Sequence, residues 1–365
     1  MGTGIKVMWE QDMRRKKSFG RKLHQRRRKL YVLPDDSEHV GLKALQGILK
    51  RVSIALASAR IHKLTVNEED GPHNLRAQLH VMLFGPTGSF KSTIMRIVRD
   101  LAQAERAKDR RYAKETPLPI LIDLTKAGLL GSVGKGGEII AGSAWLCRNS
   151  LLCLDEFLFH SQDDGSENLT VFLGLLEDQE YARSLGLFSR DVEWKDGDLF
   201  YEVHAGKLHV KTSFAMICAT MKRLSHMRSP QVHAFVNRTC PYQFKFNEPE
   251  QTKILRGEWK FTLQHYDPPP EVELSKRTYF RIVKFARKNL PWGSENFAST
   301  ENFPRAVGDL CRIYAVTGKF DKAFWKEVLG DKVSATTLIG SQYRSAEQKI
   351  ADALISAQKR GAQND

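Results

Sequence analysis

The sequence predicts an α/β protein in which a parallel sheet is flanked by helices and followed by a helical C-terminal part. Short apolar runs of strand length alternate with segments that have the apolar spacing of helices. A glycine-containing turn joins one of these runs directly to a helix. After the prolines at 268–270, helical patterns follow one another at 275–288, 304–316 and 346–359.

The expected elements follow from apolar patterning and from turn residues. A helical pattern covers 40–56, and two segments between the strands read as insertions. The glycine-rich segment 128–142 indicates a hairpin or irregular insertion, and 181–210 partly alternates around the turn Lys195-Asp-Gly-Asp198, which predicts a second hairpin. The buried strands are expected at 81–84, 117–123, 151–157 and 212–220.

The turn after the first of these strands has the layout of a phosphate-binding loop. In such a loop, backbone N–H groups and the positive end of the helix dipole face the phosphates of a nucleotide. Lys91 is expected to reach the β- and γ-phosphates, and the Ser92 hydroxyl to ligate Mg²⁺. The common pattern has glycine before the lysine, and here that position is Phe90. The loop residues are Gly85, Pro86, Thr87, Gly88, Ser89, Phe90, Lys91 and Ser92.

Two carboxylates, Asp155 and Glu156, end the strand at 151–157, about sixty residues after the loop. Taken alone, such a pair at a strand end is an ordinary solvated turn. Combined with the phosphate loop, it fits a Walker B element. Asp155 is then expected to hold Mg²⁺ through its water shell, and Glu156 to orient and deprotonate the attacking water.

Charge points to a polyanionic partner, because the 365-residue chain has a formal charge of +15 and a pI near 9.6. Residues 1–30 hold eleven Lys and Arg against two carboxylates, a net charge of +9. Such a block contacts nucleic acid backbones without reading sequence, and the alternative is a solubilising tail without a partner. The residues expected to contact DNA here are Arg14, Arg15, Lys16, Lys17, Arg26, Arg27, Arg28 and Lys29.

Composition narrows the class of protein further. A hydrophobic content of 41% fits a globular protein, and no stretch approaches the roughly 20 apolar residues of a membrane span. The N-terminus lacks an apolar signal core, so we expect a cytoplasmic location, nucleoid-associated in a prokaryote. The five cysteines are scattered, which favours small buried hydrophobes in a reducing compartment.

From about Ser37 to Lys319, the chain resembles the AAA+ motor domain of the minichromosome-maintenance (MCM) replicative helicases. The resemblance consists of several pieces in the same order as in the family, whose phosphate loop also lacks glycine before lysine. The matching pieces are Glu38–Lys43, Gly85–Ser92, Leu124–Leu129, Gly137-Glu138, Ala141–Leu146, Leu152–Phe157, Leu175–Gln179, Lys211–Ser213, Phe235–Arg238, Phe303–Arg305 and Asp309–Arg312.

The resemblance implies an AAA+ P-loop core with β-hairpin insertions and a C-terminal helical lid. The implied divisions are a basic tail at 1–35, the core at 36–260, and the lid with a C-terminal helix at 261–365. The implied cofactors are ATP and Mg²⁺. The implied partners are single-stranded or forked DNA and further copies of the chain, in a hexameric ring in the family's manner, with neither a membrane nor zinc.

The resemblance also assigns roles to individual residues. Val40 lies in the helix where the adenine sits, and Thr220 takes the place of sensor 1. Arg238 takes the place of the arginine finger and Arg305 that of sensor 2, both acting on a neighbouring subunit's nucleotide. The two insertion hairpins are expected to grip DNA through Lys135 and Lys195.

Three departures from the family pattern keep other functions open. Sensor 1 is usually Asn rather than Thr, the finger lies in Asn-Arg-Thr rather than Ser-Arg-Phe, and only the basic tail stands where the family has an oligonucleotide-binding barrel and a zinc module. The sequence therefore favours an ATP-driven DNA helicase or translocase, with two alternatives. One is a loader or remodeller that does not unwind DNA, and the other is a DNA-binding initiation factor in which ATP only sets assembly.

Overall fold

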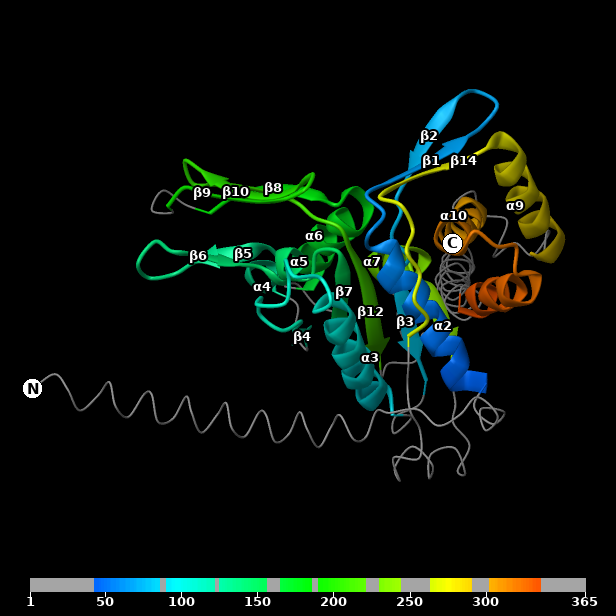
Figure 1. Cartoon of the computed structure of the whole chain (residues 1–365), viewed down its shortest axis with the longest axis horizontal. Coiled ribbons are helices and arrows are strands. Elements are labelled where there is room, and N and C mark those ends of the chain that lie inside the picture. The colour runs from blue at the N-terminus through cyan, green and yellow to red at the C-terminus, as the bar shows by residue number, and fades with distance from the viewer. Residues whose placement is uncertain are drawn as a thin grey trace, which may run out of the picture. The chain divides into compact units, whose positions relative to one another are not determined.

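A computed structural model of the chain (Figure 1) describes residues 43–85, 90–121, 125–155, 165–185, 190–220, 230–243, 263–290 and 302–335. The chain divides into two compact units. Residues 1–49 and 246–263 form the first, and residues 50–245 and 264–365 form the second. Almost all of the described residues belong to the second unit.

The centre of this second unit is a five-stranded sheet in which every neighbouring pair of strands is parallel. Its strand order is β13 (Cys240–Gln243), β3 (Val81–Phe84), β12 (Phe214–Thr220), β7 (Ser150–Leu154) and β4 (Ile120–Leu121). Every residue of β3, β7 and β12 is buried. Burial on both faces explains why these strands read as continuous apolar runs rather than as alternating patterns.

Helices connect the strands of this sheet. Helix α3 (Lys91–Arg106) leads from β3 to β4 and packs on β7 and β12 through an apolar face that includes Ile94, Met95 and Val98. Helix α6 (Gly165–Asp178) lies between β7 and β12 in the sequence, and α7 (Pro230–Asn237) between β12 and β13. The structure therefore confirms the predicted α/β class with a parallel sheet flanked by helices.

Two antiparallel elements are inserted into this core. Strands β8 (Glu180–Ser184), β11 (Lys207–Lys211), β10 (Leu199–His204) and β9 (Val192–Asp196) form one sheet in that order, and β5 (Gly131–Val133) pairs with β6 (Ile139–Ala141). Short helices α4 (Lys126–Leu130) and α5 (Ser143–Leu146) flank the β5–β6 hairpin in sequence. Both predicted hairpins are confirmed, including the turn between β9 and β10, where Gly197 has a φ of 66°.

A second core lies among the C-terminal helices. Strands β14 (Glu271–Leu274), β1 (Lys63–Asn67) and β2 (Pro72–Leu75) form a sheet in that order. Helices α9 (Lys276–Asn289) and α10 (Asn302–Thr317), a helix over residues 322–335, and the end of α2 (Lys43–Ser58) contribute to one apolar cluster with this sheet. Trp325 and Leu310 are fully buried in it.

The predicted helices at 275–288 and 304–316 correspond to α9 and α10, whereas 346–359 lies outside the described residues. Among the helices of the described ranges, none has both the length and the apolar character that crossing a membrane requires.

Candidate nucleotide-binding site

The order of strands creates a topological switch point at the carboxyl edge of the parallel sheet. From β3 the chain crosses β12 and β7 to reach β4, whereas from β12 it crosses β3 in the opposite direction to reach β13. Right-handed crossovers then place α3 and α7 on opposite faces of the sheet. In open α/β sheets, ligands bind in the crevice that opens where neighbouring connections diverge in this way.

Strand register brings three of the predicted site residues to this edge. Thr220, the last residue of β12, lies beside Phe84 of β3, so Gly85 follows at the same level. Leu154 of β7 lies beside Cys218 of β12, so Asp155 is at the edge as well. Lys91 and Ser92 begin α3 directly after the loop that leaves β3.

The backbone at Phe90 explains why a glycine is common at this position. Phe90 is the N-cap of α3 and has φ 62° and ψ 18°, which is the left-handed region. Its carbonyl accepts the first helical hydrogen bond, from the N–H of Ile94 at 2.9 Å. A left-handed conformation costs an L-residue roughly 1–2 kcal/mol that glycine avoids. The departure from the common pattern therefore preserves the turn at a cost in backbone strain.

The start of α3 has the electrostatics of an anion site. The helix is 16 residues long, and its first turn has no acidic residue that would repel an anion. The first N–H groups of any helix have no intrahelical acceptor and carry the positive end of the dipole. Lys91 is only 5% exposed, and its Nζ donates a hydrogen bond to the carbonyl of Gly85 at 2.9 Å. Its ammonium is thus held beside Gly85, the residue that follows β3 at the carboxyl edge of the sheet.

Asp155 is the second charged group of the site and is 7% exposed. Its backbone N–H donates to the carbonyl of Leu121 at 2.9 Å, which fixes the residue to the end of β4. Its Oδ1 is buried and has no hydrogen-bond partner among the described residues. A buried carboxylate oxygen without a donor is costly unless an ion or water satisfies it.

The residues at this edge fit a magnesium ion. Ser92, the second residue of α3, offers a half-buried hydroxyl, and Asp155 offers an unsatisfied carboxylate oxygen. Mg²⁺ prefers a small number of such protein oxygens and keeps several waters and phosphate oxygens as its other ligands. Thr220 is 1% exposed at the end of β12 and places a hydroxyl residue at the same edge.

Several predicted residues lie outside the described residues. These are Val40, Glu156, the central loop residues Pro86, Thr87, Gly88 and Ser89, and the tail residues Arg14, Arg15, Lys16, Lys17, Arg26, Arg27, Arg28 and Lys29.

The predicted arginine finger and sensor 2 meet on one carboxylate, Glu177 of α6. Arg238 Nε lies 2.5 Å from Glu177 Oε2, and Arg305 Nη1 lies 3.2 Å from both carboxylate oxygens. Burial acts to raise the pKa of Glu177, but Arg305, Arg238 and Arg76 outweigh it and hold that pKa below its usual value. The two arginines, 67 positions apart in the sequence, therefore form one cationic surface.

A buried charge network supports this surface. Arg76 donates to the carbonyls of Leu176 at 2.8 Å and Arg238 at 2.9 Å. Burial and the neighbouring Arg312 lower the pKa of Arg76, although an arginine stays protonated in proteins. Arg312 Nη1 pairs with Asp309 Oδ1 at 2.8 Å, and Lys332 binds the other oxygen of Asp309. The hydrogen bond from Arg76 thus fixes the backbone at Arg238.

Arg238 lies at the opposite end of the sheet from Lys91. It comes just before Cys240, and Cys240 lies beside Val81 at the beginning of β3, whereas the phosphate loop follows Phe84 at the end of β3. The rise along these strands is about 10 Å, and further residues extend the separation at both ends. Arg238 and Arg305 therefore do not belong to the site formed by Lys91 and Asp155 of their own chain.

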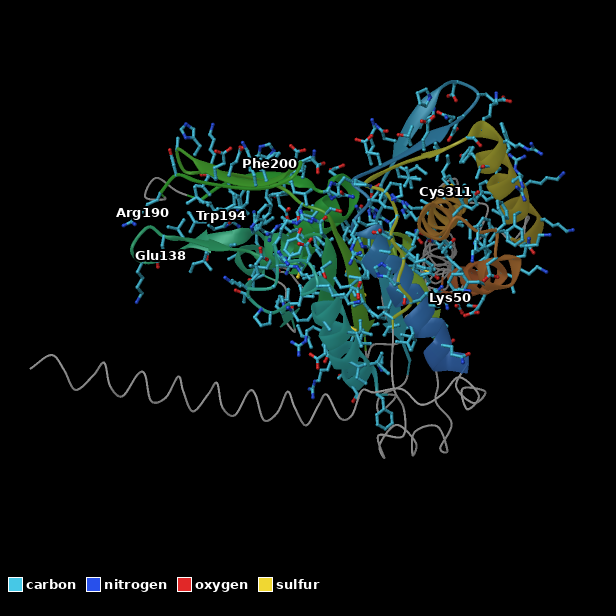
Figure 2. All side chains as sticks on the ribbon, in the orientation of Figure 1. Lys50, Glu138, Arg190, Trp194, Phe200 and Cys311 are labelled. Carbon is cyan, nitrogen blue, oxygen red and sulfur yellow. The ribbon has the colours of Figure 1, made fainter. Side chains whose placement is uncertain are left out.

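The two hairpin lysines differ in their surroundings. Lys135 is exposed in the turn between β5 and β6. Lys195 is 64% exposed on β9, where its Nζ pairs with Glu193, and this pairing raises the pKa of Lys195. Figure 2 shows Glu138 and Arg190 near each other at the ends of the two insertions, and the Arg190 N–H donates to the Gly137 carbonyl at 3.1 Å.

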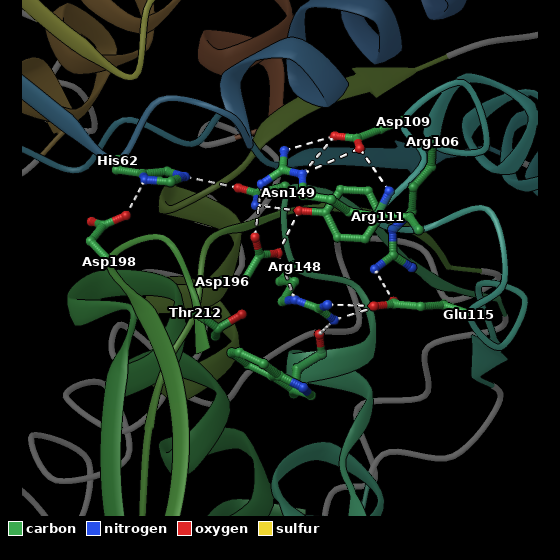
Figure 3. Close-up of polar contacts among 12 residues, drawn as sticks. His62, Arg106, Asp109, Arg111, Glu115, Arg148, Asn149, Asp196, Asp198 and Thr212 are labelled. Carbon is green, nitrogen blue, oxygen red and sulfur yellow. Dashed lines mark hydrogen bonds and ion pairs between the residues drawn. The ribbon is translucent and has the colours of Figure 1, made fainter. Parts of the chain in front are cut away.

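The β9–β10 turn beside Lys195 is fixed to the body of the unit (Figure 3). Asp196 binds Arg148 Nε at 2.9 Å, Arg111 Nη1 at 2.9 Å and the Tyr112 hydroxyl at 2.5 Å. Asp198 lies 2.5 Å from His62 Nδ1. Lys195 is therefore adjacent to an anchored turn rather than at the tip of a free hairpin.

Sequence reasoning missed the residues that organise the arginines. Glu177 lies in Leu175–Gln179, one of the segments on which the resemblance is based, yet no feature of that segment indicates its partners. Asp309 and Lys332 are 3% and 2% exposed at the side chain, and a buried charge of this kind has no local signature.

The chain matches no known family model, and it matches no curated protein. The proposed function therefore rests on the geometry of the site together with the resemblance of the sequence pieces given above.

Proposed function

We propose that this chain is an AAA+ ATPase of the MCM type that binds ATP and Mg²⁺ at the carboxyl edge of its parallel sheet. The single observation that carries the proposal is the convergence of two residues at the switch point of the sheet: Lys91, held against the Gly85 carbonyl, and Asp155, with a buried unsatisfied oxygen. In this proposal, α9, α10 and the helix over 322–335 would form the helical lid.

In this proposal, the residues of one chain bind the phosphates. The N-terminus of α3 and Lys91 neutralise phosphate charge, and Lys91 exchanges its contact with the Gly85 carbonyl for a phosphate oxygen. Ser92 and Asp155 would hold Mg²⁺, which would offset the negative charge of the phosphates. Glu156 accepts a proton from the attacking water, and Thr220 helps to position that water.

A second copy of the chain completes the site. Arg238 and Arg305 are at the other end of the sheet from Lys91, so they are suited to meet the nucleotide of a neighbour rather than their own. Such a head-to-tail contact closes into a ring when its rotation permits, and a hexamer is the ring that the family resemblance implies. An arginine that offsets transition-state charge accelerates related hydrolases by roughly 10³–10⁵.

We further propose that the ring couples hydrolysis to movement on DNA and acts as a helicase or translocase. The proposed DNA contacts of the ring are the exposed Lys135 and Lys195 on the two insertions, together with the basic tail. The non-unwinding loader and the initiation factor remain the alternatives.

Three measurements test the proposal. Steady-state phosphate release from ATP should depend on Mg²⁺ and should be lost in Lys91→Ala, whereas Lys108→Ala, which removes an exposed lysine near the far end of α3, should retain it. Displacement of a strand from forked DNA separates a helicase from the loader. An absence of ATP hydrolysis with intact ATP binding would favour the initiation factor, and an absence of ATP binding would refute the proposed site.

A further inference from the structure

Helix α9 has a strongly basic exposed face. Its 14 residues contain no Asp or Glu, and its six basic residues are Lys276, Arg277, Arg281, Lys284, Arg287 and Lys288. All six side chains are exposed. At 100° per residue, they fall within an arc of about 140° around the helix axis. Figure 2 shows the nitrogen-tipped side chains of α9 extending away from the ribbon.

The face is fixed in position by the opposite side of the helix. Ser275 caps α9 by accepting a hydrogen bond from the N–H of Thr278, and Ile282 and Ala286 are fully buried in the apolar cluster. The basic side chains therefore project from a helix that packing holds in place.

This concentration of charge is not an average property of the chain. Residues 1–30 contribute a net +9 and α9 contributes +6, which together equal the formal charge of +15. The remaining residues hold forty Lys and Arg against forty Asp and Glu. Outside the N-terminal tail, the excess positive charge of this protein is therefore equal to that of one helix face.

Most cations of this face lack the ion pairs of an ordinary solvated helix within the described residues. Lys276, Arg277, Lys284 and Lys288 form no ion pair with any residue in the described ranges, and the Arg281 guanidinium lies 4.4 Å from the centroid of the Phe320 ring. Like charges at i,i+4 are destabilising, and cations in the first turn oppose the helix dipole. Solubility alone is served by mixed charges, so this arrangement favours a polyanionic ligand.

An exposed aromatic side chain lies within the same arc. Phe280 is 42% exposed and is one of only two large hydrophobic side chains exposed in the described part of the chain. The Lys276 ammonium lies 5.9 Å from its ring centroid. Cations that track a backbone, combined with an aromatic ring on which a base can stack, are the features that bind single-stranded nucleic acid.

We propose that the exposed face of α9 is a binding surface for single-stranded nucleic acid, in which the cations contact phosphates and Phe280 stacks on a base. This surface is separate from the phosphate loop and from the hairpin lysines, and it requires no nucleotide.

The test measures the binding of the full chain to a labelled oligo(dT) of about 16 nucleotides, without ATP, across a series of salt concentrations. Each phosphate contact to a single strand contributes about 0.7 to the log–log salt slope. The double variant Arg277→Gln with Lys284→Gln should therefore lower the slope by about 1.4. The matched control is Arg110→Gln with Lys114→Gln, which removes two exposed cations outside α9 and should leave the slope unchanged.

Phe280→Ala separates stacking from charge. It should weaken binding at least about fivefold, which corresponds to the lower end of measured base-stacking contributions, and leave the salt slope unchanged. Oligo(U) in place of oligo(dT) distinguishes RNA from DNA, and retention of the Phe280 effect on either one supports the proposal. Because the assay contains no nucleotide, its result is independent of the proposed ATPase.

Three outcomes would overturn the proposal. The first is an unchanged salt slope in the α9 double variant. The second is an equal loss of slope in the control, which would indicate bulk charge rather than a surface. The third is binding to duplex DNA at least as tight as to oligo(dT) with no effect of Phe280→Ala, which would replace the single-strand surface with a contact to phosphates alone.

Discussion

Replacing Asp309 by alanine should reveal how strongly the buried charge network stabilises the fold. Asp309 binds Arg312 Nη1 through one oxygen, at 2.8 Å, and Lys332 through the other. The Asp309, Arg312 and Lys332 side chains are 3%, 7% and 2% exposed. Lys332 also donates to the carbonyls of Asn237 and Thr239, both at 3.2 Å. Asp309→Ala therefore leaves two buried cations without their shared carboxylate.

The magnitude follows from this geometry. Removing one partner of a buried ion pair costs about 3–5 kcal/mol because the other charge stays buried without compensation. The carbonyl acceptors of Lys332 keep part of its hydrogen bonding, but they do not neutralise its charge. We expect a loss near the middle of that range, which lowers the melting temperature by roughly 5–15 °C.

Thermal unfolding monitored by circular dichroism at pH 7 measures this loss. The matched control is Glu193→Ala, which removes a carboxylate from an ion pair with Lys195, where the two side chains are 57% and 64% exposed. Exposed pairs contribute about 0–1 kcal/mol, so the control should change the melting temperature only slightly. If Asp309→Ala costs no more than the control, the network does not stabilise the fold in this way.

Three further substitutions give sharp expectations. Phe90→Gly should be more stable than Phe90→Ala by about 1 kcal/mol in chemical unfolding, because both variants lose the ring and only glycine adopts the left-handed backbone without strain. Equal stability of the two variants would contradict backbone strain at this position. In the absence of Mg²⁺ and nucleotide, Asp155→Asn should raise the free energy of unfolding in urea by about 1–3 kcal/mol, because it removes a buried unsatisfied carboxylate. The same variant should abolish any rise in melting temperature on addition of Mg²⁺-ATP. A destabilised variant would indicate that the carboxylate is satisfied within the chain. Glu177→Gln should reduce the free energy of unfolding at pH 7 by up to about 1 kcal/mol, because the carboxylate is 40% exposed. Folding lowers the pKa of Glu177, so its contribution is complete above the unfolded pKa, and the difference between variant and parent should disappear as pH falls through the folded pKa. A difference that persists at lower pH would exclude the ion pairs as its cause.

Local patterning predicted the core of the fold because each signal lies within one element. The continuous apolar runs of β3, β7 and β12 reflect burial on both faces of a parallel sheet, and Lys91 marks the start of α3. The glycine-containing turns predicted both hairpins. The expected strand at 117–123 is shorter, with only Ile120–Leu121 paired in β4 among the described residues.

Features that depend on tertiary contacts could not be predicted in this way. Glu177 binds Arg238 and Arg305, which are 61 and 128 positions away, and no local pattern links them. Asp196 is in an ordinary hairpin turn by sequence, yet its ion pair with Arg148 anchors that turn. The predicted elements do not include the helix over 322–335, although the sequence indicates it. Its buried residues recur with helical spacing at Phe324, Trp325, Val328 and Leu329.

The central claim is that ATP bound at Lys91 and Asp155 of one subunit is hydrolysed with Arg238 from another. The most direct test mixes Arg238→Ala with Glu156→Gln, neither of which should hydrolyse ATP alone. In a random equal mixture, about a quarter of the head-to-tail interfaces combine an intact Glu156 with an intact Arg238. We predict that mixing restores a corresponding fraction of ATP turnover. If subunits exchange, as followed by energy transfer between labelled copies, and no turnover returns, the assignment of Arg238 to a neighbouring site is contradicted.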